Sequence, residues 1–590
     1  MSTASRLPAA GAPHQSDGTR PDPVSTLKTQ HPAGHPPAAR NPAGQWSGAQ
    51  GPAGLHSSAL FDRRTRDAAL ERPFQGSGRQ ASRPNIVFIL ADDLGWGDLG
   101  CFGSLHNQTP ALDALASQGL RFTHGYATSA TCSPTRLGLY TGRYPGRLTA
   151  GLEEPLGTRD EHHGIPADHP TLPSLLVDVG YRTAMIGKWH CGWLPWFSPL
   201  KAGFQAFYGN LDGAVDYFGH FDTSGQPDLW RDEEPVTEQG YYTEIIGRHA
   251  AAYIREAGDD PFYLQVNFTG AHWPWEGPDD EELSRHIADE PADTHEQSLK
   301  RLFHADGGSL AKYGEMVAAL DASIGEVLAA LDAKGLRENT IVVFASDNGG
   351  ERWAFMWPFV GEKGDLEEGG IRVPLIVRWP AVIDAGQVSD LPNVTFDWTA
   401  TLLDAAGATP DADHPLDGTS LLGWLTGTQG APQRDLLWRT REQGAVRRGR
   451  YKLLVDRHGH SVWHNLFGTD GRPSYRLFDL SDDGREKADV ADQHPGLVAE
   501  LKAVWHSFDE ELLPYPEVST WDAAGEGRST RVTSAQGASA QGPSAQGPSA
   551  QGPSTSGPSP AGESAPGGPT TGHPAPGHAA PGGECPGLPD

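Results

Sequence analysis

Short segments rich in apolar residues recur through the middle of the chain, and each stops abruptly at polar residues. Residues 86–90 are apolar at every position, as parallel strands buried on both faces are. Further strands are predicted at residues 120–127, 181–186, 261–268 and 341–345. Apolar positions three to four apart predict intervening helices at residues 109–119, 171–179 and 313–331, each followed or closed by Gly, and the first begins at Thr109-Pro110. This alternation predicts an α/β fold with a large mixed, mostly parallel sheet flanked by helices.

After about residue 430 the pattern changes to alternating apolar and polar positions, which is typical of antiparallel sheets. Residues 445–455 and 476–480 are predicted strands, and residues 497–513 are a predicted helix. We therefore expect a smaller C-terminal domain built on an antiparallel sheet and a helix.

The two ends differ in composition from the middle. Both are rich in Pro, Gly, Ala and Ser, and Ser-Ala-Gln-Gly-Pro recurs every five residues from Ser539 to Pro553. Such segments bury too little apolar surface to offset the entropy of ordering. The predicted organisation is a disordered leader (1–82), a large α/β domain (83–430), a smaller α+β subdomain (431–525) and a disordered tail (526–590).

Charge and cysteine content exclude several classes of protein. A formal net charge of −29 argues against nucleic-acid binding, which needs a basic surface. The chain has no apolar run near 18 residues and no signal-peptide pattern at its start, so we expect a cytoplasmic protein without membrane contact. Only four cysteines occur, at 101, 132, 191 and 585, which does not indicate a disulfide framework.

Reactive side chains follow the predicted strands. Asp92-Asp93 and Asp347-Asn348 each leave a strand and offer hard oxygen ligands, which suit Ca2+ or Mg2+. The ends of parallel strands meet at one edge of a sheet, so one site could collect them. Ser133 and Pro134 are read as an N-cap and first helical residue, which places Cys132 at a helix N-terminus. The structural alternatives are solvated turns and an inert buried thiol.

The pentapeptide Cys132-Ser133-Pro134-Thr135-Arg136, continued to Gly142, closely resembles the C-x-P-x-R signature of sulfatases. Further sulfatase-like segments occur in the family's order at residues 84–100, 180–192, 345–349 and 361–374. Together the resemblance covers about residues 83–490. The resemblance implies that a formylglycine-generating enzyme converts Cys132 to formylglycine, whose hydrate is the nucleophile. It also implies one Ca2+ per chain, with Mg2+ as the second choice, bound by Asp92, Asp93, Asp347, Asn348 and the modified Cys132.

The same resemblance assigns the remaining catalytic groups. Arg136 would reach the nucleophile and the metal ligands, and Lys188 and His190 would position the nucleophile and act as a base. His272 and Lys363 would bind sulfate and protonate the leaving oxygen. Without the family, Arg136 and Lys363 are ordinary surface charges and His272 an ordinary packed histidine. Glu161-His162-His163 could also bind a metal, but its Pro/Gly/Asp-rich surroundings favour solvent exposure.

We therefore expect an arylsulfatase-like sulfuric ester hydrolase that acts on small organic sulfate esters. Two alternatives stay open. The same groups could cleave phosphate or phosphonate esters, or Cys132 could stay unconverted in a non-catalytic binding protein. An alkaline-phosphatase-like enzyme is less consistent, because it would need two zinc ions and a Ser or Thr nucleophile.

Overall fold

The computed structural model describes residues 83–289, 307–457 and 474–516. The segments predicted to be disordered, 1–82 and 526–590, lie outside the described residues. Among the residues that the structure describes, no helix is long and apolar enough to cross a membrane. Cys101, Cys132 and Cys191 are free thiols.

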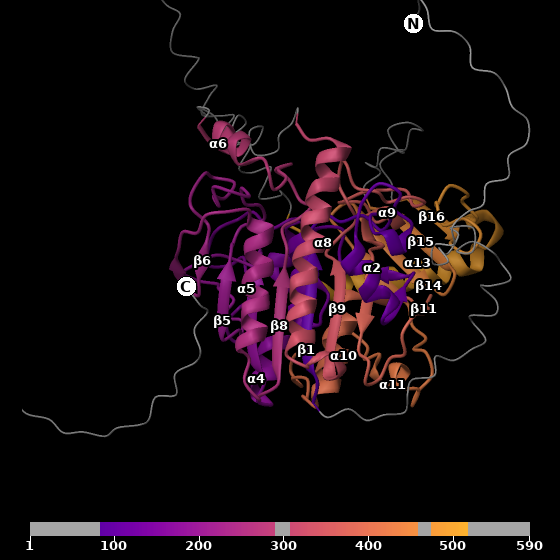
Figure 1. Cartoon of the computed structure of the whole chain (residues 1–590). Helices are drawn as coiled ribbons and strands as arrows, with labels where there is room; N and C mark the ends of the chain where they lie inside the picture. The colour runs from indigo at the N-terminus through magenta and orange to yellow at the C-terminus, as the bar shows by residue number, and fades with distance from the viewer. Residues whose placement is uncertain (1–82, 290–306, 458–473, 517–590) are drawn as a thin grey trace, which may run out of the picture. The chain divides into compact units, whose positions relative to one another are not determined.

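A ten-stranded mixed sheet forms the centre of the described chain (Figure 1). Its strands run in the order β11-β2-β10-β9-β1-β8-β4-β5-β6-β7. The middle four, β9, β1, β8 and β4, are parallel neighbours, whereas β10 runs antiparallel to β9 and β2. The predicted mixed, largely parallel sheet is confirmed. The bounds are β1 Asn85–Ala91, β2 Leu120–Phe122, β4 Arg182–Gly187, β5 Ala206–Gly209, β6 Trp230–Arg231, β7 Glu234–Pro235, β8 Phe262–Asn267, β9 Thr340–Ser346, β10 Leu375–Arg378 and β11 Gln387–Ser389.

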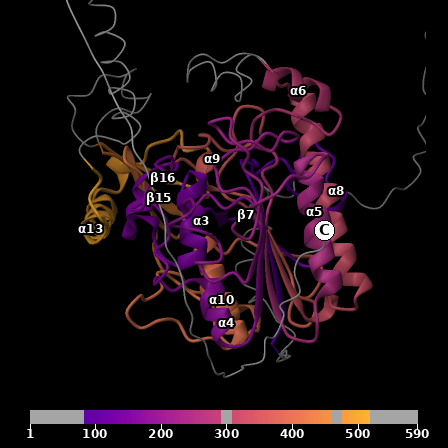
Figure 2. The ribbon, with the colours of Figure 1, turned by 90° about the vertical axis from the view of Figure 1, so that its left-hand side faces the viewer.

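Strand β1 supplies two cores because successive side chains point to opposite faces. Val87 and Ile89 pack in one apolar cluster with residues of α5 and α8, and Ile86 and Phe88 pack in a second with residues of α3, α4 and α10. Figure 2 shows these two sets of helices on opposite sides of the sheet. The helices are α2 Pro110–Ser117, α3 Cys132–Thr141, α4 Leu172–Asp178, α5 Tyr242–Glu256, α6 Glu281–Asp289, α8 Leu310–Ala333, α10 Thr395–Ala406 and α11 Leu422–Leu425.

The predicted strand at 120–127 is wrong as a single element. It is divided into β2, in the main sheet, and β3 (Gly125–Tyr126), which pairs with β12 (Asn393–Val394) in a separate two-stranded sheet. Leu375 lies so close to Gly125 that a Cβ there would meet the leucine Cβ at 2.5 Å. The chain therefore leaves the main sheet before it reaches Cys132.

The C-terminal region forms a four-stranded antiparallel sheet covered by one helix. The strands are β13 Leu436–Arg439, β14 Gln443–Arg448, β15 Tyr451–Asp456 and β16 Ser474–Asp479, and the helix is α13 Pro495–Glu511. The predicted strand at 445–455 is instead the hairpin β14–β15, which turns at Gly449, where φ is 56°. Trp505 and Phe508 of α13 pack on apolar residues of this sheet.

Candidate active site

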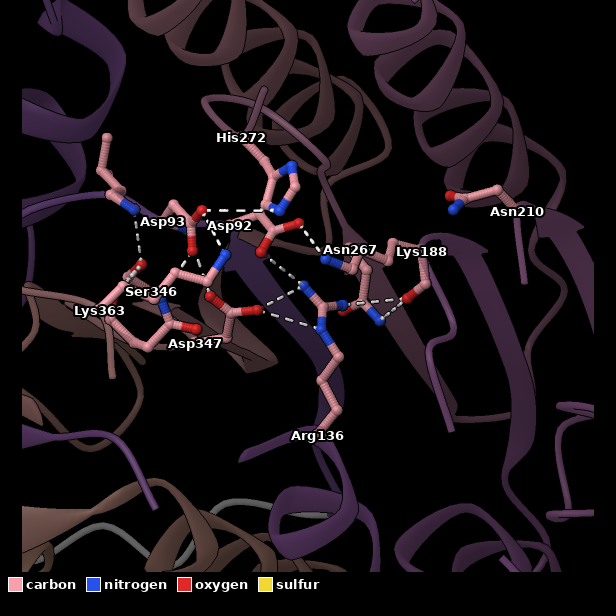
Figure 3. Close-up of polar contacts among 12 residues, drawn as sticks. Asp92, Asp93, Arg136, Lys188, Asn210, Asn267, His272, Ser346, Asp347 and Lys363 are labelled. Atoms are coloured by element: carbon pink, nitrogen blue, oxygen red, sulfur yellow. Dashed lines mark hydrogen bonds and ion pairs between the residues drawn. The ribbon is translucent and has the colours of Figure 1, made fainter. Parts of the chain in front are cut away.

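The ends of β1 and β9 bring four predicted metal ligands together. The two strands pair in parallel with Ala91 opposite Ser346, so Asp92-Asp93 and Asp347-Asn348 leave the sheet side by side. Figure 3 shows Asp92, Asp93 and Asp347 together. The amide of Asn348 donates to Asp93 Oδ1 at 2.7 Å, and the Asp93 backbone N–H donates to Asp347 Oδ1 at 3.3 Å. All four side chains are buried. Residues 254 positions apart thus share one site.

Cys132 lies beside this group. Its sulfur and carboxylate oxygens of Asp92 and Asp347 lie within 4.8 Å of one another. Cys132 is the first residue of α3, with Thr131 in the N-cap position, so the helix begins earlier than predicted and Ser133 is not its cap. Ser133 Oγ instead accepts a hydrogen bond from the Leu156 backbone N–H at 2.6 Å. The hydroxyl therefore fixes a neighbouring loop.

The donor set fits a hard divalent cation. Asp92 Oδ1 and Asn348 Oδ1 are buried and accept no hydrogen bond from the described residues. A buried oxygen without a hydrogen-bond donor is costly, and a cation would satisfy both of these atoms. Their carboxylate and amide chemistry suits Ca2+ or Mg2+ rather than zinc. Within the described ranges, the only groups of acids, His and Cys close enough to hold a metal are Asp92-Cys132-Asp347 and Asp92-Asp93-His272.

Two buried cations face the carboxylates. Arg136 donates from Nε and Nη2 to Asp347 Oδ2, at 3.1 and 2.8 Å, and from Nη1 to the Lys188 carbonyl at 3.0 Å. The Lys188 ammonium donates to Asp92 Oδ2 at 2.5 Å. Neither side chain is exposed, so the alternative of a solvent-facing Arg136 is wrong. Burial raises the pKa of Asp347 to about 7, and the nearby Asp92 carboxylate adds to the rise.

The two histidines are buried and hold their protons at defined atoms. His190 Nε2 lies 2.9 Å from the Leu156 carbonyl, so this nitrogen carries the proton and Nδ1, which has no partner among the described residues, carries the lone pair. Burial, assisted by the Lys188 charge, lowers the pKa of His190 to about 3. His272 Nδ1 lies 2.7 Å from the Trp273 carbonyl, and its Nε2 lies 3.7 Å from Asp93 Oδ2. Burial and Lys363 hold the pKa of His272 well below its ordinary value.

Lys363 reaches the same group from another segment. Its ammonium donates to Asp93 Oδ2 at 2.8 Å and lies 3.7 Å from Glu351 Oε2. Its side chain is 14% exposed and that of Glu351 is 29% exposed, whereas Asp92, Arg136 and Lys188 are fully covered. The group therefore opens to solvent on the Lys363 side.

Sequence reasoning missed three contributors. Glu351 follows Asp347-Asn348-Gly349-Gly350 directly, and its place after a strand end was the available signal. Asn267, the last residue of β8, donates to the Lys188 carbonyl at 2.7 Å and so holds the Lys188 loop. Leu156 acts only through its backbone, which no side-chain motif reveals. The alternative metal group is not assembled, because Glu161 and His162 are exposed, as expected from their surroundings.

Comparison with known proteins gives consistent similarities. A family model described as Sulfatase matches residues 84–408. Arylsulfatase J of Mus musculus is 31% identical over 499 residues, covering 76% of this chain and 79% of that protein. N-acetylgalactosamine-6-sulfatase of Homo sapiens is 33% identical over 376 residues, covering 59% of this chain and 67% of that protein. The crystal structure of Ps i-CgsB superposes with a TM-score of 0.64 at 28% identity, covering 77% of this chain and 98% of that one.

Proposed function

Because the chain belongs to the sulfatase family and is a sulfuric ester hydrolase, we propose that residue 132 carries its nucleophile, as formylglycine made from Cys132 by a formylglycine-generating enzyme. The observation that supports this most is the position of the Cys132 sulfur, within 4.8 Å of oxygens of two buried aspartates. An inert structural thiol has no need of charged neighbours. Formylglycine supplies, as its hydrate, two hydroxyls on one carbon, so that one can attack sulfur and the other can later drive release of sulfate.

One Ca2+, or Mg2+ in its place, would be held by Asp92, Asp93, Asp347, Asn348 and the modified residue 132. When bound, the cation supplies electrostatic withdrawal from a sulfate oxygen and a lowered pKa for the attacking hydroxyl. Arg136 orients Asp347 with its two hydrogen bonds and neutralises part of the acidic charge.

The two histidines differ in which ring nitrogen carries the proton, and this difference separates their proposed roles. His190 keeps its proton on Nε2 for the Leu156 carbonyl, so Nδ1 is its free acceptor atom. The resemblance to sulfatases assigns this histidine as the base toward the second hydroxyl of residue 132. Lys188, anchored on Asp92, holds positive charge beside that exchange.

On the leaving-group side, Lys363 is the better hydrogen-bond donor. His272 uses its Nδ1 proton on the Trp273 carbonyl, which leaves Nε2 without a proton while the ring is neutral. The neighbouring Asp93 carboxylate helps to hold the Lys363 ammonium charged, since its pKa lies above the ordinary value despite burial. Lys363 therefore binds the sulfate and stabilises the departing oxygen, and His272 shapes the same side of the group.

Matched aryl sulfate and aryl phosphate esters test this function. The chain is produced together with a formylglycine-generating enzyme and loaded with Ca2+, and kcat/KM is measured for both esters. We expect the sulfate ester to be the better substrate. A preference for the phosphate ester would favour the phosphate or phosphonate hydrolase, and no turnover of either by converted protein would contradict the catalytic assignment.

A further inference from the structure

Lys363 lies in a glycine-rich turn that contacts two other segments of the site. One segment follows Asn348, and the other precedes Cys132. The Lys363 N–H donates to the Gly350 carbonyl at 3.1 Å, and the Gly364 N–H donates to the Ala130 carbonyl at 2.9 Å. Ala130 lies two residues before Cys132, and Gly350 lies two residues after Asn348. Gly361 and Gly364 have φ angles of 87° and 97°, which only glycine adopts readily. Within the turn, the Asp365 N–H donates to the Glu362 carbonyl at 2.9 Å, and Asp365 Oδ2 accepts from the Glu362 N–H at 3.1 Å.

A buried carboxylate at the end of this turn is fixed by the C-terminal sheet. Glu368 begins the short helix α9 (Glu368–Ile371), and its Oε1 accepts from the Lys452 ammonium of β15 at 3.0 Å. Its Oε2 accepts from Tyr126 and Arg372, at 2.6 and 3.1 Å. Lys452 also lies 2.8 Å from Glu486, and the side chains of Glu368, Lys452 and Glu486 are fully covered. A buried charge triad of this kind tolerates little displacement, because each group depends on the others.

Two further strands of the C-terminal sheet, β14 and β16, hold the same turn. Gln443 of β14 accepts the Leu366 N–H at 2.7 Å and donates to Glu367 at 3.3 Å, and Arg476 of β16 donates to Glu367 at 3.3 Å. The backbone N–H of Glu368 donates to Glu486 at 2.5 Å. All of these anchors come from residues after 408, where the match to the Sulfatase family model ends.

We propose that Lys452 is a positioning residue of the active site, which acts through Glu368 to hold the turn that places the Lys363 ammonium beside Asp93. The C-terminal sheet therefore completes the sulfate-binding side of a site whose other groups come from the α/β domain. This inference rests on the proposed sulfate-binding role of Lys363.

Equilibrium binding of inorganic sulfate to the Ca2+-loaded full chain tests the proposal independently of turnover. Lys452→Met is expected to weaken sulfate binding about tenfold, in the same direction as Lys363→Met. The double variant decides the mechanism, because effects that act through one group are not additive. We expect Lys363→Met/Lys452→Met to bind sulfate no more weakly than Lys363→Met alone. Additive losses, or unchanged sulfate binding in Lys452→Met, would overturn the proposal.

Three further variants separate positioning from folding. Lys487→Met, an exposed lysine of the same domain, is the matched control and should leave sulfate binding unchanged. Lys452→Arg keeps a donor to Glu368 and should restore most of the affinity. If Lys452→Met does not fold, Lys452→Met/Glu486→Gln is used instead, because it removes one charge of each sign. It then replaces Lys452→Met in the comparison with Lys363→Met. If the proposed function itself is wrong, the result differs: wild-type protein would bind sulfate but would not hydrolyse an aryl sulfate.

Discussion

Two buried groups of charged side chains can be compared in this molecule. The first, the oxygen cluster, consists of Asp92, Asp93, Asp347 and Asn348 beside Cys132. The second, the glutamate triad, consists of Glu368, Lys452 and Glu486. Burial raises the pKa of one carboxyl in each, Asp347 and Glu486, to about 7. A perturbed pKa alone would therefore mark both as candidate active sites.

What differs is the arrangement of the oxygen atoms. In the oxygen cluster, carboxylates from two strands and the Cys132 sulfur converge within 4.8 Å, and Asp92 Oδ1 and Asn348 Oδ1 lack hydrogen-bond donors among the described residues. In the glutamate triad, Lys452 lies between the two carboxylates, 3.0 Å from Glu368 and 2.8 Å from Glu486. Both groups contain buried cations, but two oxygens of the oxygen cluster still lack a donor and call for an external cation, whereas Lys452 pairs with both carboxylates of the glutamate triad. The convergence of oxygen atoms on the Cys132 sulfur, rather than a shifted pKa, therefore distinguishes the candidate active site from the structural charge group.

The largest effect is expected at Cys132, the proposed nucleophile. Cys132→Ala should lower kcat on an aryl sulfate by at least roughly 10⁴-fold, since removal of a catalytic nucleophile typically costs that much or more. Cys101→Ala changes a half-buried thiol outside the cluster and should retain wild-type activity. Near-normal turnover by Cys132→Ala would remove residue 132 from the mechanism.

Loss of one oxygen ligand should come next. Asp347→Asn is expected to lower kcat/KM by more than about 100-fold, because even partners that only orient metal ligands are worth about 10- to 100-fold. Bound Ca2+, measured by elemental analysis after dialysis, should fall in parallel. Asp404→Asn changes an exposed carboxylate of α10 and serves as the control. Full Ca2+ content with intact activity in Asp347→Asn would contradict the ligand assignment.

The glutamate triad predicts a pH effect on stability. Burial, opposed by Lys452, raises the pKa of Glu486 to about 7 in the folded chain, above an ordinary value near 4.3. The folded state then holds this proton more tightly than the unfolded state, so its contribution to stability is lost as pH rises from about 4.5 to 7. Glu486→Gln removes that dependence. Its melting temperature relative to wild type should rise by a few degrees between about pH 5 and pH 8, and a flat or falling difference would contradict the account.

The smallest effect is expected at the exposed alternative metal group. His162→Ala and Glu161→Gln should change kcat/KM and bound Ca2+ by less than about twofold, as surface changes away from a site usually do. A measurable loss of Ca2+ would indicate a second cation site at this loop.

Local patterns in the sequence were sufficient to predict the main strands and the polar residues that follow them. The apolar run at 86–90 and the Asp pair after it correspond to β1 and its exit. Features set by contacts between distant segments were not predictable. Gly125, beyond the end of β2, fits closely against Leu375, and Lys452 meets Glu368 across 84 residues. The hairpin at 445–455 was missed because Arg448, Gly449 and Arg450 interrupt the alternation without a strong turn dipeptide.

The chemical state of residue 132 in active protein tests the central claim most directly. The peptide that contains it is isolated from a preparation with measured aryl sulfatase activity, and its mass is determined. We predict that the cysteine sulfur is replaced by oxygen, in a fraction that rises in proportion to specific activity across preparations. An unmodified Cys132 in fully active protein would contradict the account.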